Sequence, residues 1–477
     1  MEVYQREQMS PLDPAQRAIM EAGVRIGEVA RGLRPGGLLI EYEYWRHEEA
    51  VEATKTALAD PRIPALYEAA FAHDDIRVRV DILDRVDEAA FDLIEIKSAT
   101  RVKDAHLPDV GVQLYVLQGC GVPVRRACVA YVNNEYVYPG GEYDLEQLFV
   151  VDDVHERLER YDLDVAASLA GMREALRSEA PLEIKPGKQC TQPYVCPFYD
   201  YCREGQPEYH VSQLPRAGHD LLITLEALGV EDIRDIPASL AGLTPLQLRA
   251  RECVVGETTY IDPQVLLKLN GLEYPIHFLD FETFGLGLPV YPGTRPYEVI
   301  PFQWSNHILD RDGTLRHEEF LYTGFDDPRE PFARSLLRSV GTEGSILTYS
   351  NFESIRIREL ADKLPHLSES LMGLLEVRIV DLLVLVRDHC YHPDFRGSFS
   401  LKRVLPAMVS GFTYDDLDVS VGGQASAAYA EIISPDTTPE RREFLVEGLR
   451  EYCKRDTLAM VSLYHALLDG VRESGEC

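Results

Sequence analysis

Alternating apolar residues in the first part of the chain predict strands, and longer segments between them predict helices. In residues 76–83 the apolar positions recur at every second residue, as in a strand with one buried face: Ile76, Val78, Val80 and Ile82. Further strands are expected at residues 38–43 and 91–97. Helices are expected at residues 48–58, 110–117 and 154–177, the last of them long and amphipathic. This part of the chain is therefore predicted to be mixed α/β.

The second part of the chain shows the same mixture of patterns. Residues 275–281 are mostly apolar and predict a strand, and residues 440–471 predict a long helix. Residues 346–353 predict another strand that ends in an acid. Between the two parts, short apolar segments separated by Gly229 and Pro237 predict a small helical hairpin. We therefore expect an α/β domain at residues 1–205, a helical connector at residues 206–272 and a second α/β domain at residues 273–477.

Composition narrows the class of protein. None of the 477 residues lies in an apolar run of about 18, so no membrane span is expected, and the start of the chain lacks the apolar core of a secretory signal. We therefore expect a cytoplasmic protein. The formal net charge of −31 weakens the case for a nucleic-acid partner without excluding it, because phosphates are bound by local basic groups rather than by the whole surface.

Two motifs in the second domain carry carboxylates in a metal-binding arrangement. Asp280 and Glu282 are two residues apart, so on a strand they point to the same face. Like charges this close repel each other unless a cation neutralises them. Near the end of the chain, Tyr452 and Asp456 are four residues apart and share one helical face. Asp456 is therefore a further candidate ligand, and the Tyr452 hydroxyl is a candidate contact to a water or a phosphate oxygen.

The order of these motifs, with an acid after a strand between them, resembles the DEDD exonucleases of the RNase H-like superfamily. The resemblance implies a DnaQ-type fold for this domain and a set of metal ligands with one helper: Asp280, Glu282, Glu353 and Asp456, with Tyr452. The acid of the middle motif is usually Asp, whereas here it is Glu353. Asp381 is the alternative ligand at this position.

The same resemblance implies two divalent cations and a nucleic-acid substrate. Two such ions activate a water and stabilise the leaving oxygen of a phosphodiester, and Mg²⁺ or Mn²⁺ suits a site made of carboxylates. Gln303 and Lys402 are candidate contacts to the phosphates of the nucleic acid.

A second constellation of charged residues lies in the first domain. Asp81 follows the strand at residues 76–80, and Glu95 and Lys97 lie on the next strand, where they face the same side. Carboxylates in these positions can bind Mg²⁺ together. The Lys97 ammonium can then stabilise the attacking hydroxide or the scissile phosphate.

Three of the nine cysteines are grouped at regular spacing: Cys190, Cys196 and Cys202. Grouped thiols in a cytosolic protein indicate zinc or an iron–sulfur cluster, and three unligated thiols are the alternative. Together with the charged residues upstream, this group resembles the RecB-like PD-(D/E)XK nucleases that carry an iron–sulfur cluster, among them CRISPR-associated exonucleases.

This second resemblance implies roles for particular residues of the first domain. Its fold would be restriction-endonuclease-like, with Glu68 assisting the three catalytic residues Asp81, Glu95 and Lys97. Gln113 and Tyr115 would form the nucleic-acid-binding motif after the core. In such nucleases a fourth cysteine precedes the core and completes a [4Fe–4S] site. No cysteine precedes Cys120 here, so the sequence offers three of the four thiolates.

The pairing of both modules is similar to a bacterial family of unknown function in which a RecB-type nuclease is fused to an RNase H-like exonuclease. Residues 295–297, 301–303 and 397–402 fit this family. It implies a 3′–5′ exonuclease that acts on DNA rather than RNA, with DNA repair as one setting. Two alternatives remain open: a nucleic-acid-binding protein without catalysis, and a phosphodiesterase acting on small nucleotides.

Overall fold

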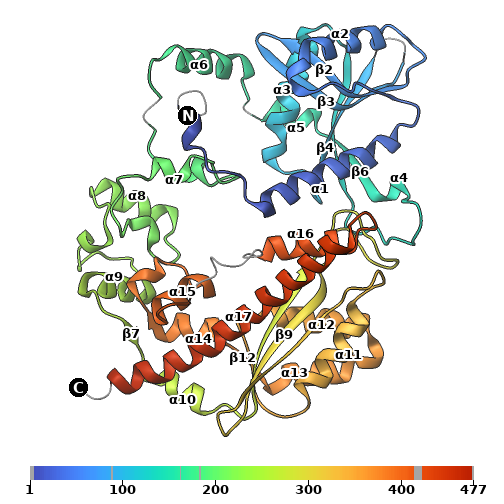
Figure 1. The fold of residues 1–477 in the computed structure, drawn as a ribbon. Coiled ribbons are helices and arrows are strands. Elements are labelled where there is room, and N and C mark those ends of the chain that lie inside the picture. Colours follow the sequence, from blue (N-terminus) through green and yellow to red (C-terminus); the bar gives the residue numbers. More distant parts are fainter. Residues whose placement is uncertain (1–4, 88–89, 162, 182–183, 413–421, 475–477) are drawn as a thin grey trace. The chain divides into compact units, whose positions relative to one another are not determined.

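The computed structural model describes residues 5–87, 90–161, 163–181, 184–412 and 422–474, and its fold is mixed α/β, as the sequence predicted (Figure 1). The chain forms two compact units. One consists of Met1–Glu204 and Gly285–Glu298, and the other of Gly205–Phe284 and Val299–Cys477. The predicted helical connector thus lies within the second unit. The short segment Gly285–Glu298, in contrast, leaves that unit between two of its strands and belongs to the first.

The first unit is built on a six-stranded sheet. Its strands follow one another in sequence order: β1 (Leu38–Leu39), β2 (Ala65–His73), β3 (Ile76–Arg85), β4 (Phe91–Lys97), β5 (Val124–Val132) and β6 (Phe149–Asp153). The pairs β1–β2 and β4–β5 are parallel, and the other neighbours are antiparallel. The strands predicted at residues 76–83 and 91–97 are therefore confirmed, while the one at residues 38–43 is only two residues long.

Helices precede, join and follow these strands. They are α1 (Pro14–Ala30), α2 (His47–Leu58), α3 (Leu107–Gly119), α4 (Leu145–Leu148), α5 (His155–Arg160), α6 (Val165–Arg177) and α7 (Tyr199–Cys202). Helix α3 makes the crossover between the parallel strands β4 and β5, as parallel pairing requires. One core contains Leu66 and Leu83 from the sheet, together with Ala50 from α2 and Val116 from α3.

The prediction of one long helix at residues 154–177 is wrong, because the structure has two shorter helices there. Helix α5 ends at Arg160, and Tyr161 has an extended backbone conformation. Asp164 then caps α6 by accepting a hydrogen bond from the Ala167 amide, so the short polar side chain begins a new helix. None of the α6 residues is buried, which shows that its apolar stripe does not face the core.

The second unit is built on a five-stranded sheet with the order β10-β9-β8-β11-β12. Its strands are β8 (Ile276–Phe284), β9 (Ile300–Leu309), β10 (Leu315–Leu321), β11 (Ile346–Thr348) and β12 (Ile379–Asp381). β9 is antiparallel to both β8 and β10, whereas β11 and β12 run parallel to β8. The strand β7 (Tyr260–Ile261) pairs separately with β13 (Cys390–Tyr391). The apolar run at residues 275–281 thus forms the central strand of the sheet.

Two layers of helices enclose this sheet (Figure 1). On one face Leu279 and Phe281 pack against α11 (Arg329–Val340), α12 (Phe352–Lys363) and α13 (Ser368–Val377). On the other, Ile276 and Phe278 pack against the long helix α17 (Pro439–Ser474), which confirms the helix predicted at residues 440–471. The remaining helices are α8 (His219–Ala227), α9 (Pro245–Gly256), α10 (Gln264–Asn270), α14 (Leu382–His389), α15 (Leu401–Met408) and α16 (Gly422–Ile432).

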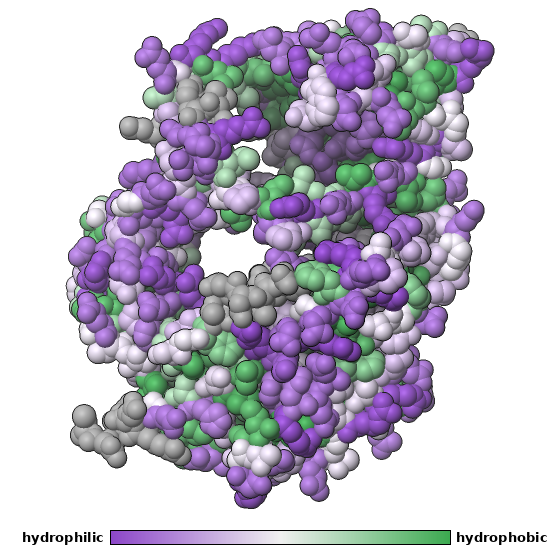
Figure 2. Space-filling model, viewed as in Figure 1, coloured by the Kyte–Doolittle hydropathy of each residue, from purple (hydrophilic) through white to green (hydrophobic). Residues whose placement is uncertain are grey.

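The surface matches the charged composition of the chain. Hydrophilic side chains cover most of the face seen in Figure 2. Within the described residues, no helix combines the length and the apolar character that crossing a membrane would require.

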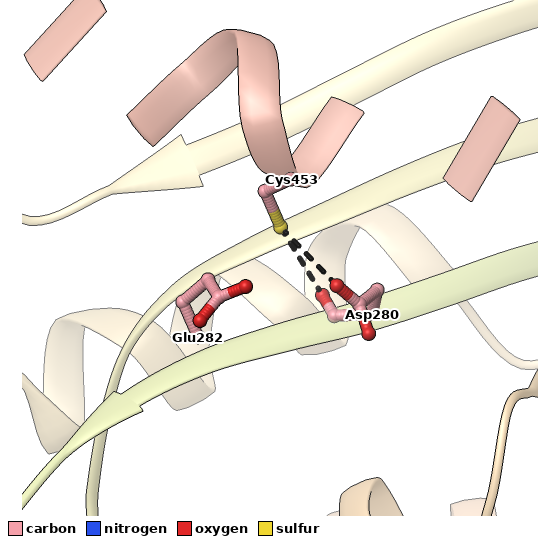
Figure 3. Close-up of side chains that lie close together, drawn as sticks. All are labelled: Asp280, Glu282 and Cys453. Atoms are coloured by element: carbon pink, nitrogen blue, oxygen red, sulfur yellow. Dashed lines mark hydrogen bonds between the residues drawn. The ribbon is translucent and has the colours of Figure 1, made fainter. Parts of the chain in front are cut away.

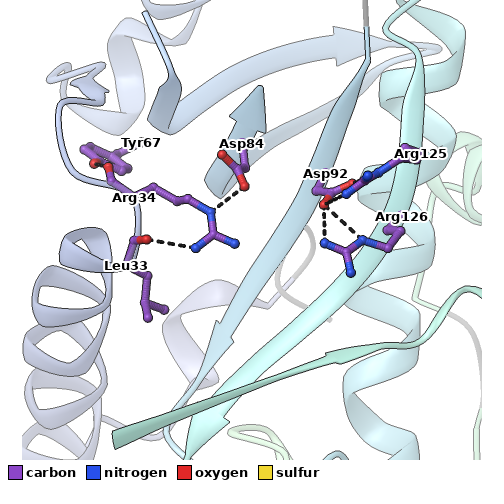
Figure 4. Close-up of polar contacts among 7 residues, drawn as sticks. All are labelled: Leu33, Arg34, Tyr67, Asp84, Asp92, Arg125 and Arg126. Carbon is purple, nitrogen blue, oxygen red and sulfur yellow. Dashed lines mark hydrogen bonds and ion pairs between the residues drawn. The ribbon is translucent and has the colours of Figure 1, made fainter. Parts of the chain in front are cut away.

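A buried carboxylate at the start of β4 joins two strands of the first sheet (Figure 4). Asp92 is 1% exposed and accepts hydrogen bonds from Arg125 at 2.9 and 2.6 Å and from Arg126 at 3.0 and 2.5 Å. The strand register shifts here, because Phe91 pairs with Val124 but Asp92 pairs with Arg126. The extra residue of this bulge lets both guanidinium groups reach the same carboxylate.

We predict that Asp92→Asn destabilises the protein by about 2–3 kcal/mol, since it removes the charge from these hydrogen bonds. Burial raises the pKa of Asp92, but the hydrogen bonds from Arg125 and Arg126 lower it by more, so the pKa is below its usual value. The stabilisation is therefore complete above about pH 4 and is lost as the pH falls through the lowered pKa. Urea unfolding at pH 7 and pH 3 measures both effects.

A matched control is Asp60→Asn, because Asp60 binds the largely exposed Arg62 on the surface. This variant should unfold at nearly the same urea concentration as the parent. Equal urea midpoints for the Asp92 and Asp60 variants would contradict the structural role of Asp92.

Candidate functional site

The central strand β8 places Asp280 and Glu282 beneath helix α17. Side chains alternate along the strand, so Leu279 and Phe281 enter the core on the opposite face. Phe278, on the same face as the two acids, contacts the ring of Tyr464 on α17 with a centroid separation of 5.6 Å. The two carboxylates are thus held on a rigid central strand and face a long helix.

Helix α17 brings a thiol to these carboxylates (Figure 3). The Sγ atom of Cys453 lies 3.7 Å from Oδ2 of Asp280 and 3.8 Å from its carbonyl oxygen. One ligand atom from each of Asp280, Glu282 and Cys453 lies within 4.8 Å of the others. Sequence reasoning missed Cys453, although its position three residues before Asp456 on one helix indicates a nearby face.

Asp456 lies close to the same carboxylates. Burial raises the pKa of Asp280 and Glu282 well above the usual range, and the charge of Asp456 is the next largest cause for both. Burial also raises the pKa of Tyr452, and Asp456 raises it further, so the tyrosine hydroxyl keeps its proton. The structure therefore brings together Asp280, Glu282, Tyr452 and Asp456.

Glu353 reaches this cluster from a different element than the sequence predicted. The strand β11 ends at Thr348, and Ser350 has a φ of 128°, which turns the chain before α12 begins. Glu353 thus lies in the first turn of α12 and not at the end of a strand. It is 3% exposed, and its Oε2 atom has no hydrogen-bond partner among the described residues. Its charge raises the pKa of both Asp280 and Glu282.

The alternative ligand, Asp381, lies at the end of β12 and begins the next helix. Its carboxylate caps α14 by accepting a hydrogen bond of 3.2 Å from the Val384 amide. Its charge raises the pKa of Glu353, so the two acids are near each other. The Asp381 carboxylate is therefore engaged in capping a helix, whereas the Oε2 atom of Glu353 has no hydrogen-bond partner among the described residues.

A lysine stands beside the cluster. Lys402, on α15, donates a hydrogen bond of 3.2 Å to the Tyr452 hydroxyl, and its Nζ lies 4.8 Å from the centre of the Tyr452 ring. Its positive charge lowers the pKa of Glu282, against the larger effect of burial. Lys402 is thus placed where a phosphate near the carboxylates would meet a positive charge.

Gln303, in contrast, is in the wrong place for the predicted contact with nucleic acid. It pairs with Glu282 across β8 and β9, is fully buried, and donates a hydrogen bond of 2.8 Å to the carbonyl of Leu449. Its role is to join β9 to α17. The sequence did not reveal this, because β9 is buried along its whole length despite its polar residues.

Polar contacts fix α17 on the sheet next to Asp456. The Oγ1 atom of Thr457 lies 2.7 Å from the hydroxyl of Ser305 and 2.8 Å from Nδ1 of His307. Burial lowers the pKa of His307 to about 4, so its ring is neutral at pH 7. These buried groups are hydrogen-bonded in only one alignment of helix and strand, which sets the position of Asp456.

The residues predicted in the first unit also meet. The Nζ atom of Lys97 lies 2.9 Å from Oε1 of Glu95, and the side chain of Gln113 donates a hydrogen bond of 2.6 Å to Oε2 of Glu95. Asp81 lies within β3, and it accepts a hydrogen bond of 2.6 Å from the Ile96 amide. Burial raises the pKa of Asp81 well above its usual value, and the charge of Glu95 adds to this effect.

Two residues near this site differ from the prediction. Asp109, in the first turn of α3, accepts a hydrogen bond of 2.5 Å from Lys97 and was not foreseen. Tyr115 does not join the site, because its hydroxyl donates to Asp74 at 2.9 Å in the β2–β3 turn. Glu68 pairs with Arg31 at 3.3 Å, and its charge contributes to the raised pKa of Asp81.

The two units differ in how well they fit a metal ion. Asp280, Glu282 and Cys453 are the one group of three potential ligands this close together in the described part of the chain. With Glu353 and Asp456 beside them, the donor set fits divalent cations.

The three grouped cysteines of the first unit lie near one another. The Cys196 amide donates a hydrogen bond of 2.8 Å to the Cys190 carbonyl. Burial is the main cause that raises the pKa of Cys202, and the thiols of Cys190 and Cys196 raise it further. An iron–sulfur cluster there stays a prediction.

Part of the chain matches a family model that has no assigned activity. Residues 277–400 match the family model described as a domain of unknown function, DUF2779. The match begins on β8 and covers Asp280, Glu282, Glu353 and Asp381. No curated protein and no solved structure matches the chain.

We predict that without divalent cations the protein becomes less stable as the pH rises from about 5 to 8. Burial is the main cause that raises the pKa of Glu353 to about 8, while unfolded Glu titrates near about 4.3. The folded state therefore binds more protons than the unfolded state in this window, and stability falls as they are released. Thermal unfolding in EDTA at several pH values measures the fall.

Mn²⁺ should remove most of this pH dependence, because it compensates the carboxylate charges. Glu353→Gln should also reduce the dependence measured in EDTA. A pH dependence that is the same with and without Mn²⁺ would show that the acidic cluster does not bind the cation.

Proposed function

We propose that this protein is a metal-dependent nuclease whose second unit hydrolyses phosphodiester bonds at a DEDD-type site in an RNase H-like fold. The observation that carries the proposal is the gathering of buried and partly buried carboxylates at one place: Asp280 and Glu282 on β8, Glu353 on α12 and Asp456 on α17. Burying like charges together is unfavourable without a cation. The order and directions of the strands around β8 are consistent with this fold.

Asp280, Glu282, Glu353 and Asp456 would hold the divalent ions, and three elements of the fold, β8, α12 and α17, keep them in place. When bound, two such ions activate a water and stabilise the oxygen that leaves the phosphorus. The protonated Tyr452 hydroxyl can donate a hydrogen bond to a phosphate or water oxygen. Lys402, which contacts Tyr452, would attract the phosphate to the cluster.

The first unit would supply a second, RecB-like nuclease site. Glu95 and Asp81 provide carboxylates, and Lys97 provides the charge that stabilises the reacting phosphate. Here, however, Lys97 is bound by both Glu95 and Asp109. The lysine must leave Asp109 before it can contact a phosphate, so this site is proposed as the less active of the two.

The charge of the chain favours a second candidate function, hydrolysis of small phosphoesters such as dinucleotides. A net charge of −31 repels a long polyanion more than a short one. Turnover of a dinucleotide and of single-stranded DNA, compared at low and at moderate salt, separates the two functions. Preference for the dinucleotide at both salt concentrations would favour the small-substrate enzyme.

We predict that Asp280→Asn lowers Mn²⁺-dependent shortening of end-labelled single-stranded DNA by at least about a hundredfold, because it removes a ligand from the central strand. The matched variant is Lys97→Ala, which alters the first unit and should leave this shortening in place. If Lys97→Ala abolishes the activity while Asp280→Asn retains it, the nuclease belongs to the first unit. Retained binding without cleavage in the parent would favour a non-catalytic nucleic-acid-binding protein.

The choice between Glu353 and Asp381 can be tested with two substitutions that keep the size of the side chain. We predict that Glu353→Gln reduces turnover by at least about a hundredfold, whereas Asp381→Asn reduces it by less than about tenfold, since an Asn side chain still caps a helix. Single-turnover rates over a range of Mn²⁺ concentrations give both effects. The reverse order of the two variants would make Asp381 the ligand.

A further inference from the structure

The thiol of Cys453 lies among carboxylates that the proposed nuclease would use for hard cations. Cys453 is fully buried on α17, and its Sγ is 3.7 Å from Oδ2 of Asp280. Glu282 offers a further oxygen, with all three ligand atoms within 4.8 Å of one another. Figure 3 shows the thiol pointing from the helix toward the strand that carries both acids.

The separation between the Cys453 thiol and the Asp280 carboxylate suits a tetrahedral ion. A zinc–sulfur bond of about 2.3 Å and a zinc–oxygen bond of about 2.1 Å at a tetrahedral angle place sulfur and oxygen about 3.6 Å apart. The distance from Sγ to Oδ2 of Asp280 is 3.7 Å, close to this value. The separations that involve Glu282 are at most 4.8 Å, so its oxygen would have to move by up to about 1.2 Å to bind the same ion.

Glu353 provides an independent indication of an absent ligand. Its Oε2 atom is buried without a hydrogen-bond partner among the described residues, although a buried carboxylate oxygen normally has one. Its charge acts on both Asp280 and Glu282, so the carboxylate belongs to the same cluster. A cation at the cluster, or a water that the cation holds, would give this oxygen a partner.

We propose that Cys453, Asp280 and Glu282 form a site for a thiophilic divalent cation of the Zn²⁺ and Cd²⁺ class. Sulfur is a soft ligand that Mg²⁺ does not prefer, whereas Zn²⁺ and Cd²⁺ bind it strongly. When such an ion binds, the S–H bond breaks, a metal–sulfur bond forms and the proton passes to solvent, without any oxidation or reduction. The thiol would then make the centre prefer soft ions to Mg²⁺ at the same carboxylates.

This site rests on the proposed function only because both use the carboxylates of Asp280 and Glu282. The test therefore measures metal binding and not hydrolysis. The full chain carrying Cys190→Ser, Cys196→Ser and Cys202→Ser is stripped of metal and titrated with CdCl₂. The replacements remove the grouped thiols that would otherwise bind Cd²⁺. The ultraviolet charge-transfer absorbance of the cadmium–sulfur bond and the affinity are recorded.

In this background Cys453→Ala should abolish the absorbance and weaken Cd²⁺ binding by at least about tenfold. Cys390→Ala is the matched control, because Cys390 is also a buried thiol of the second unit, packed in the apolar core. It should leave both readouts unchanged. Cys453→Ser serves if the alanine variant does not fold, as judged by circular dichroism, and should also lose the absorbance.

Two outcomes separate this inference from the proposed function. Unchanged absorbance and affinity in the folded Cys453 variant would overturn the site, even if the protein cleaves DNA with Mn²⁺. A signal that depends on Cys453 in a protein that hydrolyses no phosphodiester would support the site and reject the nuclease.

Discussion

The second unit is organised around the repulsion between carboxylates that its fold brings together in a largely buried place. Asp280, Glu282, Glu353 and Asp456 come from three different elements, and burial raises the pKa of Asp280, Glu282 and Glu353. Without a cation such a cluster either takes up protons or destabilises the fold, because a carboxylate charge is poorly solvated there. The elements that carry these carboxylates must therefore be held in place against that repulsion.

The surrounding structure meets this requirement with rigid elements and buried polar contacts. β8 is the middle strand of five, and apolar layers on both faces fix its position. Helix α17 is aligned with the sheet by Thr457, which contacts Ser305 and His307, and by the hydrogen bond from Gln303 to Leu449. The polar residues of the buried strand β9 therefore help to determine where Asp456 lies.

The first unit handles its charges differently. Asp92 is compensated by two arginines, and Lys97 is compensated by Glu95 and Asp109. Among the described residues of this unit, no three potential metal ligands lie as close together as the group in the second unit. The segment Gly285–Glu298 leaves the second unit immediately after β8 and packs in the first, where Tyr297 and Ser98 are hydrogen-bonded at 2.8 Å. The end of the strand that carries Glu282 is therefore continuous with a part of the first unit.

The sequence alone determined the features that depend on neighbouring positions. The period of two placed Asp280 and Glu282 on one face of a strand, and the spacing of four placed Tyr452 and Asp456 on one face of a helix, because both periods are properties of the local backbone. Only the tertiary structure decided that Glu353 lies near Asp280, that Gln303 is buried and that Cys453 faces Asp280. These facts depend on contacts between segments far apart in the chain, and a residue's burial and partners are set by those contacts.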